Sequence, residues 1–92
     1  MPAFSAEQVA SRLAALPGWQ VENGELTRTF RFEDFVAALA FVNLVGEQAE
    51  KAGHHPDIDI RYNRVRLALV THDAGGLTAK DFDLAAAVDR PL

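Results

Sequence analysis

Cysteine is absent from this 92-residue sequence, which contains a single tryptophan, a single tyrosine and a single methionine. Without cysteine the chain cannot use disulfides, a thiolate zinc site or thiol catalysis, and we expect a reducing cytoplasm as its compartment. No stretch approaches the ~20 consecutive apolar residues that a membrane span needs. The N-terminus lacks a basic region ahead of an apolar run, which would mark a secretory signal. We therefore expect a soluble cytoplasmic protein with no membrane partner.

The size and composition indicate one folded domain that covers residues 1–92. A second hydrophobic core would leave too little apolar surface for either core in a chain of this length. Apolar residues make up 49% of the sequence, which excludes a disordered chain. The net charge of −4 argues against a nucleic acid as the partner, because nucleic-acid-binding surfaces are basic.

Capping and turn signals divide the N-terminal third into a helix and a β-hairpin. Ser5 and Gln8 have the spacing of a capping box, so we expect a helix over residues 6–15 that ends before a Pro-Gly pair. Asn23 and Gly24 are typical of a type I′ turn, and apolar residues alternate with polar ones on both sides of them. The sequence therefore predicts a hairpin centred on this pair.

A long helix is expected over residues 35–52, because this stretch contains no proline and Gly53 follows it. Residues 35–45 are apolar almost all round, which is more than the single covered face of a surface helix requires. We interpret the excess as a subunit interface of a homo-oligomer, with a dimer favoured over a tetramer. The alternative is a helix surrounded by its own monomer, which needs a larger domain than this one.

A second hairpin is expected over residues 57–69, where apolar and polar residues alternate again. We assign its two-residue turn to Asn63 and Arg64, so that the apolar residues of both strands share one face. The register that this turn implies pairs Tyr62 with Val65, Ile60 with Leu67, and Ile58 with Leu69.

The last helix begins at a second capping box, formed by Thr78 and Asp81, and ends at Pro91. The element order is then helix, strand, strand, helix, strand, strand, helix. This order predicts an α+β fold in which a four-stranded antiparallel sheet has three helices packed on one face.

All three histidines of the chain are predicted to meet at one end of this sheet. His54 and His55 follow the long helix, and His72 follows the last strand. A lone histidine is most often structural, but three at one corner favour general acid-base chemistry near neutral pH. Asp81 caps the last helix in this interpretation and can face the same corner.

A metal site is the main alternative at this corner. Histidine together with Asp57, Asp59 or Asp73 could bind zinc or iron. The spacing of these residues matches no established ligand pattern, and adjacent histidines at the entry to a strand point to different sides. Acid-base chemistry is therefore the favoured interpretation.

Three segments of the sequence carry a recognisable family pattern. They are EKAGHHPD at residues 50–57, YNRV at residues 62–65 and THDAGGLTAKD at residues 71–81. With these segments the chain closely resembles the pterin-4a-carbinolamine dehydratases, and the likeness extends over essentially its whole length. Ile58 stands where many members have tryptophan, and Lys80 stands where some have arginine.

The resemblance implies a reaction, an assembly and a set of site residues. The reaction is the loss of water from 4a-hydroxytetrahydropterin, as catalysed by 4a-hydroxytetrahydrobiopterin dehydratases, to give quinonoid dihydropterin and so to recycle the pterin of aromatic amino-acid hydroxylases. The resemblance also implies oligomers built by sheet extension and helix packing. It further implies a reaction that uses no metal or redox cofactor. The family's catalytic positions fall on His54, His55, His72 and Asp81, and its substrate-binding positions fall on Glu50, Pro56, Asp57, Thr71, Gly76, Leu77 and Thr78.

The resemblance leaves a second class of function open. The same family includes a dimerisation cofactor for a transcription factor, and related proteins act as assembly factors or as accessories of cofactor metabolism. Such interaction modules have no physical need for three histidines that converge on one pocket. The complete histidine set therefore favours an enzyme.

Overall fold

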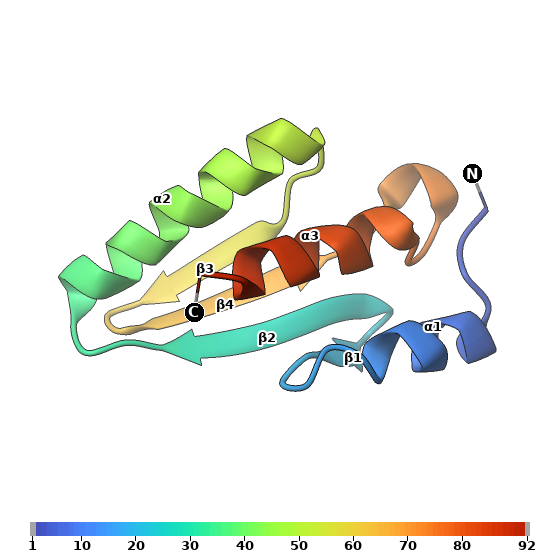
Figure 1. The fold of residues 1–92 in the computed structure, drawn as a ribbon, viewed down its shortest axis with the longest axis horizontal. Coiled ribbons are helices and arrows are strands. Elements are labelled where there is room, and N and C mark those ends of the chain that lie inside the picture. Colours follow the sequence, from blue (N-terminus) through green and yellow to red (C-terminus); the bar gives the residue numbers. More distant parts are fainter. Residues whose placement is uncertain (1, 92) are drawn as a thin grey trace.

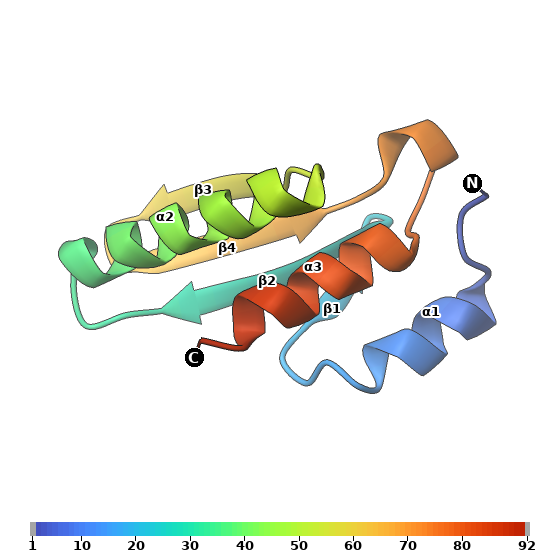
Figure 2. The ribbon, with the colours of Figure 1, turned by 45° about the horizontal axis from the view of Figure 1, so that its top comes forward.

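A computed structural model describes residues 2–91 and shows one antiparallel sheet with strand order β1-β2-β4-β3 (Figure 1). The elements are α1 (Ala6–Leu13), β1 (Gln20–Glu22), β2 (Glu25–Arg31), α2 (Phe35–Ala52), β3 (Asp57–Arg61), β4 (Arg64–Leu69), the short 3-10 helix η1 (His72–Ala74) and α3 (Ala79–Asp89). Helices α2 and α3 lie side by side across one face of the sheet (Figure 2). The α+β fold and the element order expected from the sequence are confirmed. No helix within residues 2–91 is long and apolar enough to span a membrane.

Helices α1 and α2 both begin at a capping side chain. The Ser5 hydroxyl accepts a hydrogen bond from the Gln8 N–H, and the Asp34 carboxylate accepts one from the Ala37 N–H. Helix α2 covers the predicted residues 35–52 and ends at Gly53, whose φ of 62° is in the left-handed region that glycine tolerates. Helix α1 ends two residues earlier than predicted, because the next turn forms tighter hydrogen bonds between residues three apart.

The two hairpins differ in how well the sequence predicts them. In the first, Asn23 and Gly24 both have positive φ, as a type I′ turn requires, and the prediction is confirmed. In the second, the turn consists of Tyr62 and Asn63, so the predicted turn at Asn63 and Arg64 is wrong. The predicted register is wrong by two residues, since the observed pairs are Arg61 with Arg64, Ile60 with Val65, and Ile58 with Leu67.

The shifted turn has a physical cause in the contacts of Asn63. Its side-chain amide donates to the carbonyl oxygen of Phe32 over 3.0 Å, and its own carbonyl accepts the Phe32 N–H over 2.8 Å. These two bonds hold Asn63 beside the end of β2 and leave Tyr62 to adopt the positive φ of 50°. A shift of two residues keeps every side chain on its face, because side chains alternate with a period of two. The apolar face is therefore unchanged.

The hydrophobic core lies between the sheet and the two long helices. Most of its large buried members come from β2, β4, α2 and α3, namely Leu26, Phe30, Val65, Leu67, Leu69, Phe41, Val45, Phe82, Leu84 and Val88, and Leu16, Trp19 and Leu77 join them from the connecting segments. Val9 and Leu13 of α1 pack against the same core. Near its N-terminal end, α2 leaves Phe35, Val36 and Leu39 exposed, and Val36 is 74% exposed.

The chain segment before α1 is tied to the loop that leads into α3. The Phe4 N–H donates to the Leu77 carbonyl oxygen over 2.7 Å. Ala3 lies against Gly76, where an added Cβ would be 3.0 Å from the Ala3 Cβ. This contact fixes the loop from Gly75 to Thr78 from the outside, next to the residues described below.

Candidate active site

All three histidines line one hollow at the end of the sheet where β4 ends. Its volume is about 310 Å³, and its lining residues are Gly53, His54, His55, Val70, Thr71, His72, Asp73 and Lys80. His54 and His55 are placed there because α2 ends at Gly53, and His72 is placed there by the turn that follows β4. Segments that are separate in the sequence therefore supply imidazoles to one surface.

His54 is held by a buried carboxylate. Its Nε2 lies 2.6 Å from Oδ1 of Asp81, and the two side chains are 12% and 0% exposed, respectively. When Asp81 is ionised it can only accept, so Nε2 carries the proton of this bond. The other ring nitrogen, Nδ1, forms no hydrogen bond with residues 2–91 and is the one available to a ligand.

The second oxygen of Asp81 is held by two donors from the loop before α3. The Thr71 hydroxyl and the Thr78 backbone N–H both donate to Oδ2 over 2.9 Å. Since the Thr71 hydroxyl uses its proton on Asp81, the Thr78 hydroxyl donates to Thr71 across their 2.8 Å contact. Asp81 therefore caps α3 and orients His54 at the same time.

The other two histidines are more accessible than His54. His55 Nε2 lies 2.5 Å from Oε2 of Glu50, in a pair whose side chains are 64% and 78% exposed. His72 is exposed in η1, and its ring forms no hydrogen bond with the residues that the structure describes. The hollow thus contains one histidine fixed by a buried acid, one paired with an exposed acid, and one without a partner among residues 2–91.

The residues expected to bind substrate fall into two groups. Thr71 lines the hollow, and Glu50 and Thr78 contact residues that line it. Pro56, Asp57, Gly76 and Leu77 are not among the lining residues. Leu77 belongs to the core, and Gly76 supports the site through its backbone pairing with Thr71.

Sequence reasoning missed the part of Lys80 in this site. Lys80 lines the hollow together with the histidines, as do Val70 and Asp73. The sequence did contain a signal for this role. Lys80 follows Thr78 by two residues, at the start of a predicted helix beside the expected histidine corner. Of the three aspartates considered as metal ligands, Asp73 lines the hollow, whereas Asp57 and Asp59 do not. Within residues 2–91, no group of three or more histidine, aspartate or glutamate side chains has an arrangement that could hold a metal ion.

Comparison with known proteins defines the family of this chain. The family model described as pterin 4 alpha carbinolamine dehydratase matches residues 2–91. The chain belongs to this family. A relative from Acidobacterium capsulatum, provisionally named a pterin-4-alpha-carbinolamine dehydratase, is 62% identical over 92 residues, which are the whole of both chains.

Two solved structures related to this dehydratase family share the fold. A transcriptional coactivator/pterin dehydratase from Brucella melitensis superposes with a TM-score of 0.92 at 34% identity, over 96% of each chain. A pterin dehydratase-like protein identified as a RuBisCO assembly factor in the alpha-carboxysome superposes with a TM-score of 0.64 at 25% identity. That match covers 78% of this chain and 83% of the assembly factor. The likeness therefore extends to proteins whose names describe a function other than dehydration.

The dehydratase-family chain has the groups that proton transfer near neutral pH requires. Imidazole gives and takes protons in this range, and three imidazoles line the same hollow. The buried Asp81 fixes the tautomer and the orientation of His54, as carboxylates do for histidines in many catalytic sites. The arrangement can supply both a general acid and a general base to one bound ligand.

Proposed function

We propose that the protein dehydrates a 4a-hydroxytetrahydropterin to the quinonoid dihydropterin, with histidines as the acid and the base. The observation that carries this proposal is the hollow lined by His54, His55 and His72, in which His54 is bonded to the buried Asp81. Membership of the dehydratase family supports the same substrate class.

The reaction needs only two proton transfers. The C4a–O bond breaks, its electron pair leaves with oxygen, and an acid supplies the proton that makes water. A base takes the proton from N5, and the nitrogen electron pair forms the C4a=N5 double bond. Each well-placed acid or base typically contributes about 10²–10⁴-fold to a rate, so two histidines are sufficient for this chemistry.

His54 would act on the substrate through Nδ1, because Asp81 occupies its Nε2. His55 and His72 are the exposed histidines of the hollow and can exchange protons with water between turnovers. The proposal requires one acid and one base among these three residues.

The alternative is a module that assembles other proteins without catalysis. It is supported by the structural similarity to the RuBisCO assembly factor, which has a lower TM-score and lower identity than the Brucella melitensis protein. An assembly module has no need of an imidazole held by a buried acid. Turnover therefore discriminates between the two functions.

The test is dehydration of 4a-hydroxytetrahydropterin generated in the assay by an aromatic amino-acid hydroxylase. We expect His55→Ala and His72→Ala each to lower the rate by at least about tenfold, since each removes a candidate proton carrier. Both residues are exposed, so the fold should persist in circular dichroism spectra. Arg61→Ala, on an exposed strand away from the hollow, serves as the control for substitution.

Wild-type rates in both folded histidine variants would overturn the proposed acid-base role.

The metal alternative is tested in the same assay by adding EDTA. We expect turnover to continue in EDTA, and stoichiometric zinc whose removal stops turnover would establish the alternative.

A further inference from the structure

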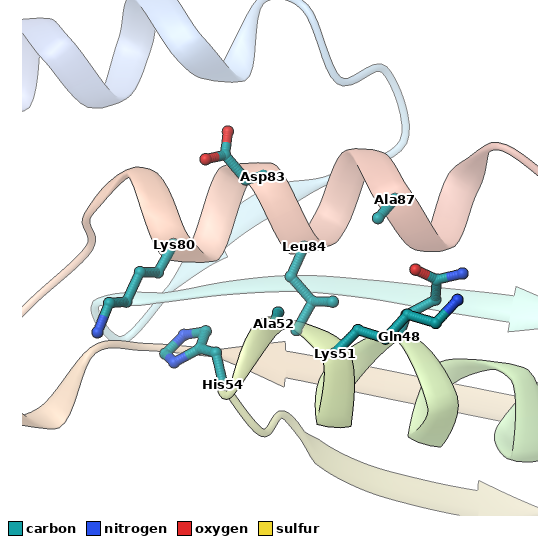
Figure 3. Close-up of a pocket in the computed structure, with 8 residues that line it drawn as sticks. All are labelled: Gln48, Lys51, Ala52, His54, Lys80, Asp83, Leu84 and Ala87. Atoms are coloured by element: carbon teal, nitrogen blue, oxygen red, sulfur yellow. The ribbon is translucent and has the colours of Figure 1, made fainter.

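A second hollow borders the candidate active site on the other side of His54. Its volume is about 300 Å³, and it is lined by Gln48, Lys51, Ala52, His54, Lys80, Asp83, Leu84 and Ala87. His54 and Lys80 line both hollows. Figure 3 shows the second hollow between the C-terminal part of α2 and the side of α3. Its position makes it a continuation of the site in which the histidines lie.

The chain has only two lysines, and both of them line this hollow. None of the seven arginines does. Neither Lys51 nor Lys80 forms a salt bridge with a carboxylate of residues 2–91. In a chain of net charge −4, two such ammonium groups on one hollow are a local excess of positive charge.

The position of Lys80 is unfavourable for the helix that carries it. Lys80 is the second residue of α3, and a cation in the first turn of a helix is repelled by the positive end of the helix dipole. Lys51 lies in the last turn of α2, where the dipole favours a cation. Helix stability can therefore explain Lys51 but not Lys80, and a bound anion beside Lys80 would explain its position.

The remaining lining of the hollow suits a ligand with an apolar part. The side chains of Ala52, Leu84 and Ala87 form an apolar surface between the polar residues (Figure 3). The one carboxylate of the lining, Asp83, is already paired with Arg12 over 3.0 Å. In Figure 3 the Lys80 amine lies at the His54 end, and the Lys51 amine lies beside Gln48 at the other end.

We propose that this second hollow binds the substituent of the pterin ring, and that it selects substituents with an apolar stem and an anionic end. The anion is a phosphate ester or a carboxylate, both of which accept hydrogen bonds from ammonium groups. Lys80 contacts an anion that lies close to the ring, and Lys51 with Gln48 contacts one at the end of a longer stem. This inference rests on the proposed function, since the pterin ring occupies the histidine hollow.

The test compares three dihydropterins by isothermal titration calorimetry on the full chain. They are 6-hydroxymethyl-7,8-dihydropterin, which is neutral, its phosphate monoester, and dihydrofolate, which carries carboxylates on an aromatic stem. We expect at least one anionic ligand to bind about tenfold more tightly than the neutral one, since charge-assisted hydrogen bonds contribute on this scale. The phosphate and carboxylate arms distinguish the two sources of the anion.

Substitution of the lysines tests the assignment to this hollow. Lys80→Gln should reduce the ratio of anionic to neutral affinity by about fivefold for the short phosphate monoester, and Lys51→Gln should do so for dihydrofolate. Lys51→Arg should retain the ratio. Arg64→Gln is the matched control, because it removes one positive charge at the opposite end of β4. Its ratio should equal that of the wild type.

Three outcomes would overturn the inference. The first is equal affinity of the wild type for neutral and anionic ligands, and the second is an unchanged ratio in both lysine-to-glutamine variants. If 4a-hydroxytetrahydropterin is dehydrated in either case, the proposed function stands and only the inference fails. The third is the absence of both pterin binding and dehydration, which overturns the inference together with the proposed function.

Discussion

Asp81 combines two tasks that place different demands on one side chain. As a helix cap alone it would need one acceptor oxygen for the Thr78 N–H. In the structure its other oxygen faces His54, and Thr71 adds a third hydrogen bond. The capping box and the approach to the histidine corner could be predicted from the spacing of Thr78 and Asp81. The bond to Thr71 could not, because it depends on how the loop folds back.

Asp81→Asn should separate these two tasks. The asparagine oxygen can replace Oδ2 as the acceptor from Thr71 and Thr78, which leaves its NH₂ group facing His54 Nε2. His54 must then accept at Nε2 and carry its proton on Nδ1, which is the tautomer opposite to that of the wild type. We expect dehydration to fall by at least about tenfold, and unfolding free energy to fall by about 1–3 kcal/mol through the altered buried bonds.

Nitrogen NMR of His54 identifies the tautomer directly, and chemical denaturation measures the loss of stability. Asp59→Asn is the matched control, since Asp59 is an exposed residue of β3 that pairs with Arg61 and lines neither hollow. It should change the rate little. A wild-type tautomer and rate in Asp81→Asn would show that Asp81 is a helix cap and nothing more.

The two hairpins show which element features can be predicted from sequence. The first is fixed by local chemistry, because Asn23 and Gly24 adopt positive φ at little cost. In the second, the turn is selected by the bonds between Asn63 and Phe32, which are 31 residues apart in the chain. No local pattern contains that contact, and Tyr62 is an unusual residue for a positive φ.

The same difference between local patterns and long-range contacts applies to the candidate active site. The histidines could be placed at one end of the sheet because they follow the ends of a predicted helix and a predicted strand. The position of Lys80 after Thr78 indicates the same corner, but its contact with both hollows could not be predicted, because it depends on how α3 packs beside α2. Residues carried by element ends are thus more predictable than residues whose role depends on packing between elements.

The first hairpin should contribute a pH-dependent part of the stability. The hydrogen bond from the Thr27 hydroxyl, followed by that from Arg66, holds the pKa of Glu22 below its ordinary value of 4.5. A lowered folded-state pKa stabilises the fold above the unfolded value, and this contribution is lost as the pH falls through the folded value. In urea denaturation, the unfolding free energy of wild type should therefore exceed that of Glu22→Gln by a constant amount above about pH 5.5. This difference should decrease below about pH 4.5.

Glu33→Gln removes one exposed negative charge outside this hairpin and controls for the change in net charge. The change in unfolding free energy that Glu33→Gln causes at each pH should be subtracted before wild type and Glu22→Gln are compared. An advantage of wild type over Glu22→Gln that is equal at pH 7 and at about pH 3 would contradict the assignment to Glu22 ionisation.

The whole molecule leaves apolar surface on α2 that its own core does not cover. Phe35, Val36 and Leu39 are exposed there, at positions where a polar side chain would fit as well. Contiguous exposed apolar surface of this kind marks association sites. We therefore expect a homo-oligomer in solution, and Val36→Glu should shift its mass toward that of the monomer because it buries a charge in the contact.

Multi-angle light scattering at micromolar concentration measures both masses. Ala10→Glu, at an exposed position of α1, introduces the same charge elsewhere and should leave the mass unchanged. A monomeric wild type would refute the association, and α2 would then simply carry exposed apolar residues.

The contact between the N-terminal segment and the loop before α3 has a practical consequence for every assay described above. Phe4 is bonded to Leu77, and Ala3 touches Gly76, so a fusion tag placed before residue 2 would emerge beside the loop that holds Thr78. A polyhistidine tag there would bring foreign imidazoles close to a hollow whose chemistry depends on imidazole. It could supply protons to a variant that lacks its own histidine and hide the loss of activity. Purification tags therefore belong after α3, or should be cleaved before the rates are compared.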